Sequence, residues 1–111
     1  MDDKTLLIEC LGGSPVLRII DFFLDNRLFD YSKNELINNL RMSRVTFFRY
    51  WKELEKFEIV KPTRKIGKST LYRLNEENEI VKRLIALDSA LCKQAMNRYV
   101  EMERERTPVL A

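Results

Sequence analysis

Apolar residues recur every three or four positions in three short stretches of the chain, and a serine stands before each stretch. Ser14 precedes a proline, Ser32 begins a Ser-x-x-Glu capping box with Glu35, and Ser43 follows a two-residue turn. The spacing therefore predicts helices over about 15–26, 33–40 and 44–56. Residues 4–11 are also apolar and end at Gly12-Gly13, but they fit a short helix or a strand equally well.

The third of these helices has two distinct faces. Phe47, Trp51 and Leu54 are spaced i, i+4 and i+7, which predicts that they face the core. The outer face carries Val45, Arg49, Lys52 and Lys56, with Thr46 and Phe48 at its borders. Only the turn Arg41-Met42 and the N-cap Ser43 separate this helix from the one before it, so the pair predicts a helix-turn-helix.

Two strand-like runs follow the helix pair. Residues 59–64 and 69–74 read as paired strands joined by 65–68, where Gly67 can adopt a positive φ. Pro62 cannot donate to a strand ladder and therefore favours an edge strand. A hairpin at this place predicts a winged helix, a mainly α fold with a small β-hairpin wing (α+β).

The segment 76–106 contains neither proline nor glycine and predicts one long helix. Such a helix spans on the order of 45 Å, more than a domain of this size can cover. Its apolar seam is typical of a dimer interface. The candidate interface residues are Ile80, Leu84, Leu87, Leu91, Met96 and Tyr99.

The 111 residues suit a single domain, with 14–75 as a DNA-binding core and 76–106 as a dimerisation helix. No apolar run approaches the roughly 20 residues that span a bilayer, so we expect no membrane partner and a cytoplasmic, nucleoid-associated protein. The chain has no histidine, which removes the commonest general base and metal ligand. We therefore expect no enzyme activity, no metal and no cofactor. Cys10 and Cys92 are expected to be buried or half-buried thiols.

Positive charge is concentrated in the helix-turn-helix and the hairpin. From Arg41 to Arg73 there are ten Lys/Arg and three Glu, a net charge of +7, whereas the rest of the chain sums to −4. This distribution predicts binding to the phosphates of duplex DNA, with the second helix in the major groove and the wing, about 61–70, on the backbone or in the minor groove. The candidate DNA contacts are Ser43, Arg44, Val45, Thr46, Phe48, Arg49, Tyr50, Lys52, Arg64, Lys65 and Lys68.

The run from Ser32 to Lys56 resembles the helix-turn-helix of winged-helix transcriptional regulators of the ArsR and MarR type, and 59–74 resembles their wing. Their recognition helix commonly carries Ser-x-x-Thr-apolar-x-Arg-x-apolar, and the matching residues here are Ser43, Thr46, Phe47, Arg49 and Trp51. The general character of the sequence is similar to that of small archaeal, viral or plasmid regulators. Two features depart from the family: there is no Cys/His cluster for metal sensing, and Phe57-Glu58 replaces the glycine that usually follows the recognition helix.

The resemblance implies a homodimeric transcriptional repressor or regulator. A two-fold dimer would place its recognition helices in successive major grooves about 34 Å apart, on a pseudo-palindromic site. The alternative is a winged-helix adaptor for protein–protein interaction or for plasmid or viral DNA maintenance.

Overall fold

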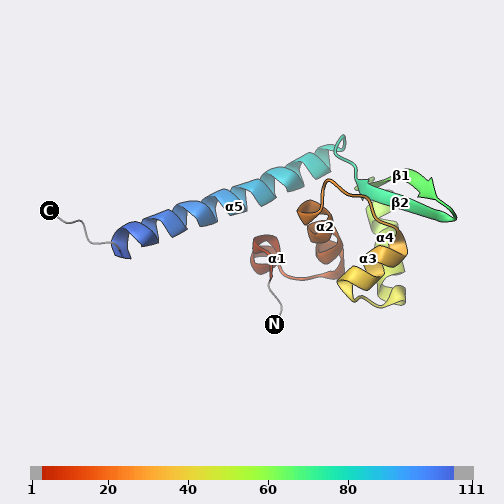
Figure 1. The fold of residues 1–111 in the computed structure, drawn as a ribbon, viewed down its shortest axis with the longest axis horizontal. Coiled ribbons are helices and arrows are strands. Elements are labelled where there is room, and N and C mark those ends of the chain that lie inside the picture. Colours follow the sequence, from red (N-terminus) through yellow and green to blue (C-terminus); the bar gives the residue numbers. More distant parts are fainter. Residues whose placement is uncertain (1–3, 107–111) are drawn as a thin grey trace.

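The structure, a computed structural model, describes residues 4–106, and it confirms the predicted fold class (Figure 1). A helical body carries a two-stranded hairpin at one end and a long helix that extends from it at the other. The elements are α1 (Leu6–Leu11), α2 (Pro15–Asp25), α3 (Lys33–Leu40), α4 (Arg44–Lys56), β1 (Val60–Ile66), β2 (Ser69–Leu74) and α5 (Glu79–Arg106).

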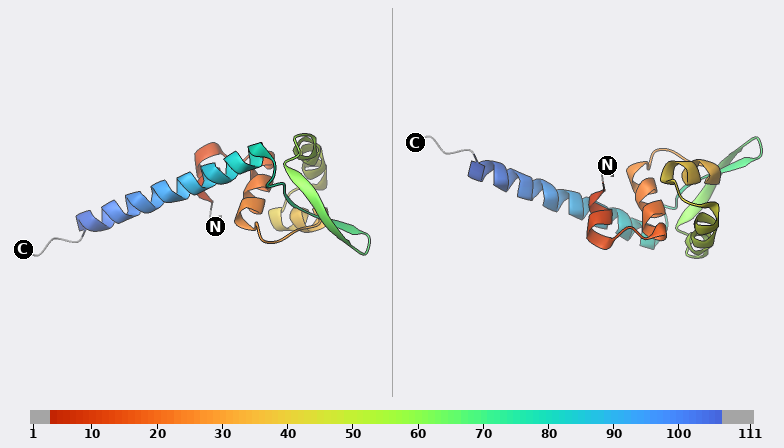
Figure 2. Two further views of the ribbon diagram at one scale, coloured as in Figure 1. Left: turned by 90° about the horizontal axis from the view of Figure 1, so that it is seen from above. Right: turned by 90° about the horizontal axis from the view of Figure 1, so that it is seen from below.

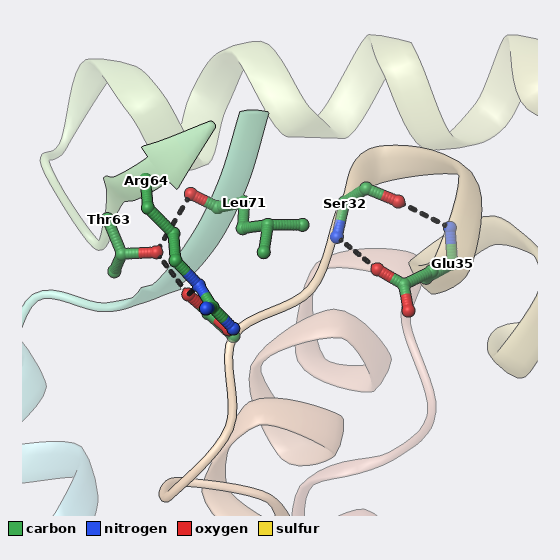
Figure 3. A network of polar contacts seen from close by, with 6 residues as sticks. Ser32, Glu35, Thr63, Arg64 and Leu71 are labelled. Atoms are coloured by element: carbon green, nitrogen blue, oxygen red, sulfur yellow. Dashed lines mark hydrogen bonds and ion pairs between the residues drawn. The ribbon is translucent and has the colours of Figure 1, made fainter. Parts of the chain in front are cut away.

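The three serine signals each begin a helix as predicted. Ser14 and Ser43 accept hydrogen bonds from the backbone N–H three residues on. Ser32 and Glu35 form both bonds of the capping box, at 3.1 and 2.9 Å (Figure 3). Thr5 caps α1 in the same way, which shows that the ambiguous first segment is a helix.

The hairpin is antiparallel, and its register runs from Val60 opposite Leu74 to Ile66 opposite Ser69. Only Gly67 and Lys68 form the turn, with Gly67 at a φ of +62°. The four-residue connection expected from the sequence was therefore too long, because Lys65 and Ile66 continue the first strand. The register shifts between Pro62 and Arg64, which marks a β-bulge at Thr63.

The core lies between α2, α3, α4 and the hairpin, with Trp51 among its largest fully buried side chains. Trp51 stacks on Phe47 with ring centroids 5.2 Å apart and meets the edge of Tyr72 at 5.1 Å. Phe47, Trp51 and Leu54 are buried, as their spacing predicted. No helix in residues 4–106 is long and apolar enough to cross a membrane.

Helix α5 begins at Glu79, later than the expected 76, because Asn78 closes its N-terminal end. The Asn78 side chain accepts from the Ile80 N–H and donates to the Phe57 carbonyl. Val81 is fully buried, whereas the helix beyond Leu91 extends past the body (Figures 1 and 2). The radius of gyration is 17.5 Å, against about 13 Å for a compact chain of this length.

Both cysteines are exposed, so the expectation that they are buried or half-buried was wrong. Cys10 lies on α1, a six-residue helix that buries only Leu7. Cys92 follows Leu91, at the point where α5 leaves the core. Neither helix has enough neighbouring structure in the described chain to cover the thiol.

Candidate nucleic-acid interface

Helix α4 presents a polar outer face because its apolar residues anchor the opposite face. Val45 is 72% exposed, and most of the candidate contacts around it are open to solvent. The exposed candidates are Ser43, Arg44, Val45, Arg49 and Lys52. Thr46, Phe48 and Tyr50 are half-buried, and the two aromatic rings pack partly against the core.

The turn between α3 and α4 is stabilised by contacts with the core and with α2. Arg41 takes the left-handed conformation, with φ at 52°, and ends α3. Met42 is buried, and Arg18 of α2 donates a hydrogen bond to the Leu40 carbonyl. These contacts fix the crossing of the two helices and therefore the direction in which α4 points.

A groove of about 310 Å³ separates α3 and α4 from strand β2, and Lys33 lies in it. Its ammonium group lies 5.5–5.9 Å from the centroids of Phe48, Trp51 and Tyr72. Sequence reasoning missed Lys33, because only the folded chain brings Tyr72 of the hairpin next to α3 and α4. The groove is lined by Ser32, Lys33, Asn34, Arg44, Phe48, Lys68, Ser69, Thr70 and Tyr72.

Arg44 is pre-oriented at the entrance to this groove. Its guanidinium donates to the Asn34 side chain at 2.9 Å and lies 5.3 Å from the centre of the Phe48 ring. Phe48 is thus covered by cations rather than left bare. The groove gathers three cationic side chains and no carboxylate, a composition that suits an anion such as a DNA phosphate.

The wing residues separate into two groups. Lys65 and Lys68 are exposed near the turn. Arg64 is instead engaged by Asp30, which accepts from its Nε at 3.0 Å and from its Nη2 at 3.2 Å. The hydrogen bonds from Arg64 and Thr63 lower the pKa of Asp30 to about 2.

The segments that form the helix-turn-helix and the hairpin are rich in positively charged residues. Residues 41–52 and 60–74 contain nine Lys/Arg and no Asp or Glu, and the acidic residues of α4 begin only at Glu53. The nine are Arg41, Arg44, Arg49, Lys52, Lys61, Arg64, Lys65, Lys68 and Arg73. These segments contribute cations and no carboxylate of their own, which suits the negatively charged backbone of a nucleic acid.

The candidate dimer residues on α5 do not all share one environment. Leu84 and Leu91 pack partly against the protein's own core. Ile80, Leu87, Met96 and Tyr99 are exposed. Within residues 4–106, no three Cys, Asp or Glu side chains gather as the ligands of a metal ion would.

The fold defined by these elements is a winged helix-turn-helix, and it is similar to solved structures of transcriptional regulators at low sequence identity. The chain matches an apo mutant of ZitR from Lactococcus lactis with a TM-score of 0.58 and 14% identity, over 90% of this chain and 75% of that one. It matches the adhesin competence repressor AdcR from Streptococcus pyogenes with a TM-score of 0.57 and 14% identity, over 89% and 74%.

A possible transcriptional regulator from Methanosarcina mazei Go1 matches with a TM-score of 0.52 and 18% identity, over 90% of this chain and 84% of that one. Wild-type ZitR in complex with DNA matches at 0.54 and 14%, over 81% and 61%. No protein-family model and no curated protein matches the sequence. These likenesses show the fold.

Proposed function

We propose that this protein binds double-stranded DNA as a homodimer and regulates transcription. Helix α4 enters the major groove, and the hairpin lies on the backbone or in the minor groove. The observation that carries the proposal is that residues 41–52 and 60–74, which contain nine Lys/Arg and no Asp or Glu, form the helix-turn-helix and hairpin of a winged-helix fold. The solved complex of ZitR with DNA supports it, because a protein of the same fold binds DNA.

Within this surface the side chains take different roles. Arg49 suits guanine O6 and N7, and Val45 and Thr46 suit a thymine methyl group. Ser43 and the first N–H groups of α4 suit a phosphate. Lys33, Arg44 and Lys68 lie around the groove between α3, α4 and β2, where the positive charge of all three meets the backbone.

The dimer part of the proposal rests on the helical face of α5. Tyr99 and Met102 follow Val81 and Leu84 by 18 residues each, which is five full turns, so each pair shares a face. Val81 is fully buried, whereas Tyr99 is 63% and Met102 58% exposed. The stripe that packs on the core thus continues about 27 Å further along the helix without a covering partner. A second copy would cover it and would supply the second recognition helix.

The test is a binding titration with unrelated duplexes at two salt concentrations, followed by selection from a random duplex pool. We expect nanomolar to micromolar binding that weakens steeply with salt, and a selected site with two-fold symmetry. Binding that ignores salt, or no enrichment of any sequence, would contradict sequence-specific binding through this surface. A single-stranded oligonucleotide with the same number of phosphates is the control for simple charge attraction.

A further inference from the structure

We propose that Arg64, although it lies in the basic wing, is a positioning residue rather than a DNA contact. Its ion pair with Asp30 fixes the hairpin relative to the helix-turn-helix. The inference rests on the proposed function, because the hairpin is positioned for DNA. The positive charge of Arg64 alone would predict a direct contact with DNA, and the inference assigns it a structural role instead. The phosphate contacts of the wing then fall to Lys65 and Lys68.

The Asp30 carboxylate is the centre of a small network. It accepts two hydrogen bonds from the Arg64 guanidinium, at 3.0 and 3.2 Å, and one from the Thr63 hydroxyl, at 2.5 Å. The Thr63 hydroxyl also lies 3.2 Å from the Leu71 carbonyl on the other strand. Figure 3 marks this contact with a dashed line. The two-pronged geometry suits arginine alone, because lysine cannot form a planar fork with a carboxylate.

The network joins two parts of the chain that are far apart in sequence. Asp30 belongs to the connection between α2 and α3, and Thr63 is the bulged residue of β1. Next to it, Tyr31 and Tyr72 exchange backbone hydrogen bonds of 2.9 and 2.8 Å. The connection thus attaches to both strands of the hairpin.

This attachment matters because a two-stranded hairpin alone is only marginally stable in water. The bulge at Thr63 would otherwise let the outer part of the hairpin bend and twist. Asp30 holds both the bulged residue and its neighbour, at the point where such a bend would start. The side chain of Asp30 is only 15% exposed, so it is enclosed by these partners.

The decisive variants are Arg64→Lys and Arg64→Ala, tested for affinity at several salt concentrations. If Arg64 positions the wing, both weaken DNA binding by about two- to fivefold, and neither changes the slope of log affinity against log salt. Lys65→Ala is the positive control, and it lowers the slope by about 0.9. The proposal would be overturned if Arg64→Lys bound DNA like the wild-type protein and Arg64→Ala lowered the salt slope by about 0.9. Both results are expected of a direct phosphate contact, because a phosphate binds either lysine or arginine.

Asp30→Asn tests the other side of the pair. We expect a loss similar to that of Arg64→Ala, and no further loss when the two changes are combined. Tighter binding by Asp30→Asn would overturn the proposal, since it would mean that Asp30 only neutralises a DNA-binding arginine. Arg27→Gln is a matched control, because Arg27 lies in the same connection as Asp30 and forms an exposed ion pair with Glu76, which follows β2.

Hydrogen exchange of the free protein separates this inference from the proposed function. Asp30→Asn should speed exchange at the amides of Tyr31, Tyr72 and residues 63–65, whereas Arg27→Gln should leave them unchanged. Unchanged exchange in Asp30→Asn would overturn the positioning role, whatever the protein binds. If the wild-type protein bound no duplex, the proposed function would fail, and exchange would still decide whether Asp30 fixes the hairpin.

Discussion

In the proposed complex with DNA, we assign base reading on α4 to Arg49. It is exposed near the middle of the outer face, and it forms no ion pair with any described residue. We expect Arg49→Ala to weaken binding to the selected site by roughly 1–3 kcal/mol and to relax the preference at one base pair. Competition with single-base variants of the site measures both effects. Lys56→Ala, on the last residue of α4, is the control and should leave the base preference unchanged.

Lys65 and Lys68 should contribute affinity without sequence preference. Both are exposed near the tip of the hairpin, and a lysine contact to a phosphate is blind to the base. The double variant Lys65→Ala/Lys68→Ala should weaken all duplexes alike and lower the salt slope by about 1.8. Titrations of the selected site and of an unrelated duplex over a salt series check this. A loss confined to the selected site would assign the two lysines to base recognition instead.

Side-chain roles that depend on one helix could be predicted from the sequence, and roles that depend on two elements could not. The helical period alone separates buried Phe47 and Trp51 from exposed Arg49. Lys33 went unnoticed because its aromatic neighbours come partly from the hairpin. Arg64 looked like a free cation because nothing in the sequence places Asp30, 34 residues earlier, beside it.

At the scale of elements, the end of α4 contains a residue in an unfavourable conformation. Glu58 has a φ of 56°, in the left-handed region that favours glycine. The turn is closed by a hydrogen bond from the Ile59 N–H to the Leu54 carbonyl. Glu58→Gly should therefore raise the free energy of unfolding by about 0.5–1 kcal/mol.

Urea unfolding measures this change, and Glu55→Gly is its matched control. The control puts glycine inside the same helix, where it should lower stability by about 1 kcal/mol. Destabilisation by both variants would mean that the Glu58 side chain contributes more than its backbone strain costs.

Helices α2 and α5 bring the carboxylates of Asp21, Asp25 and Asp88 near one another, and none of the three forms an ion pair within residues 4–106. Burial raises the pKa of Asp25, and the nearby charges of Asp21 and Asp88 raise it further. A raised pKa means that the folded state favours the neutral acid, so ionised Asp25 opposes folding above that pKa. Stability should accordingly rise as the pH falls from neutral through the raised pKa.

Asp25→Asn removes the charge and keeps the shape. At pH 7 it should stabilise the protein by a few tenths of a kcal/mol, a modest value because the group is largely exposed to solvent. Below the usual aspartate pKa of about 4 the gain should vanish, since Asp25 is then neutral as well. Unfolding curves at pH 7 and pH 3.5 check the sign, and an equal gain at both values would rule out the electrostatic explanation.

The ends of helices could be predicted from the sequence where a capping residue specifies them. Ser14, Ser32 and Ser43 started helices at the predicted residues because a cap is formed within one turn. The length of the hairpin turn and the start of α5 were misjudged. Both depend on partners in other segments, namely the register of β2 and the bond from Asn78 to Phe57.

At the scale of the whole molecule, the shape is the main evidence for a second copy. The chain is 67 Å long and 32 by 24 Å across, and α5 accounts for the extension (Figure 2). Apolar residues on an extended helix are costly to expose to water. The distal residues Met96, Tyr99, Val100 and Met102 are all exposed, and a two-fold partner could bury them.

Carboxylates placed on this stripe should break the proposed dimer. Tyr99→Glu/Met102→Glu puts two negative charges on the face that continues from Val81 and Leu84. We expect a monomer in sedimentation equilibrium at concentrations where the wild-type protein is dimeric, because each buried charge would lack a partner. Asn97→Glu is the control, since at 100° per residue it lies about 160° around the helix from Tyr99.

The proposed DNA binding should depend on α5 as well as on α4 and the hairpin. A monomer keeps its α4 and hairpin but lacks the second recognition helix, which would contact the second half-site. The double variant should therefore bind a full site no better than a half-site. Binding of the isolated half-site should stay at the wild-type level if the winged-helix core is intact. A variant that is monomeric but still prefers the full site would show that the two copies associate on DNA through a surface other than α5.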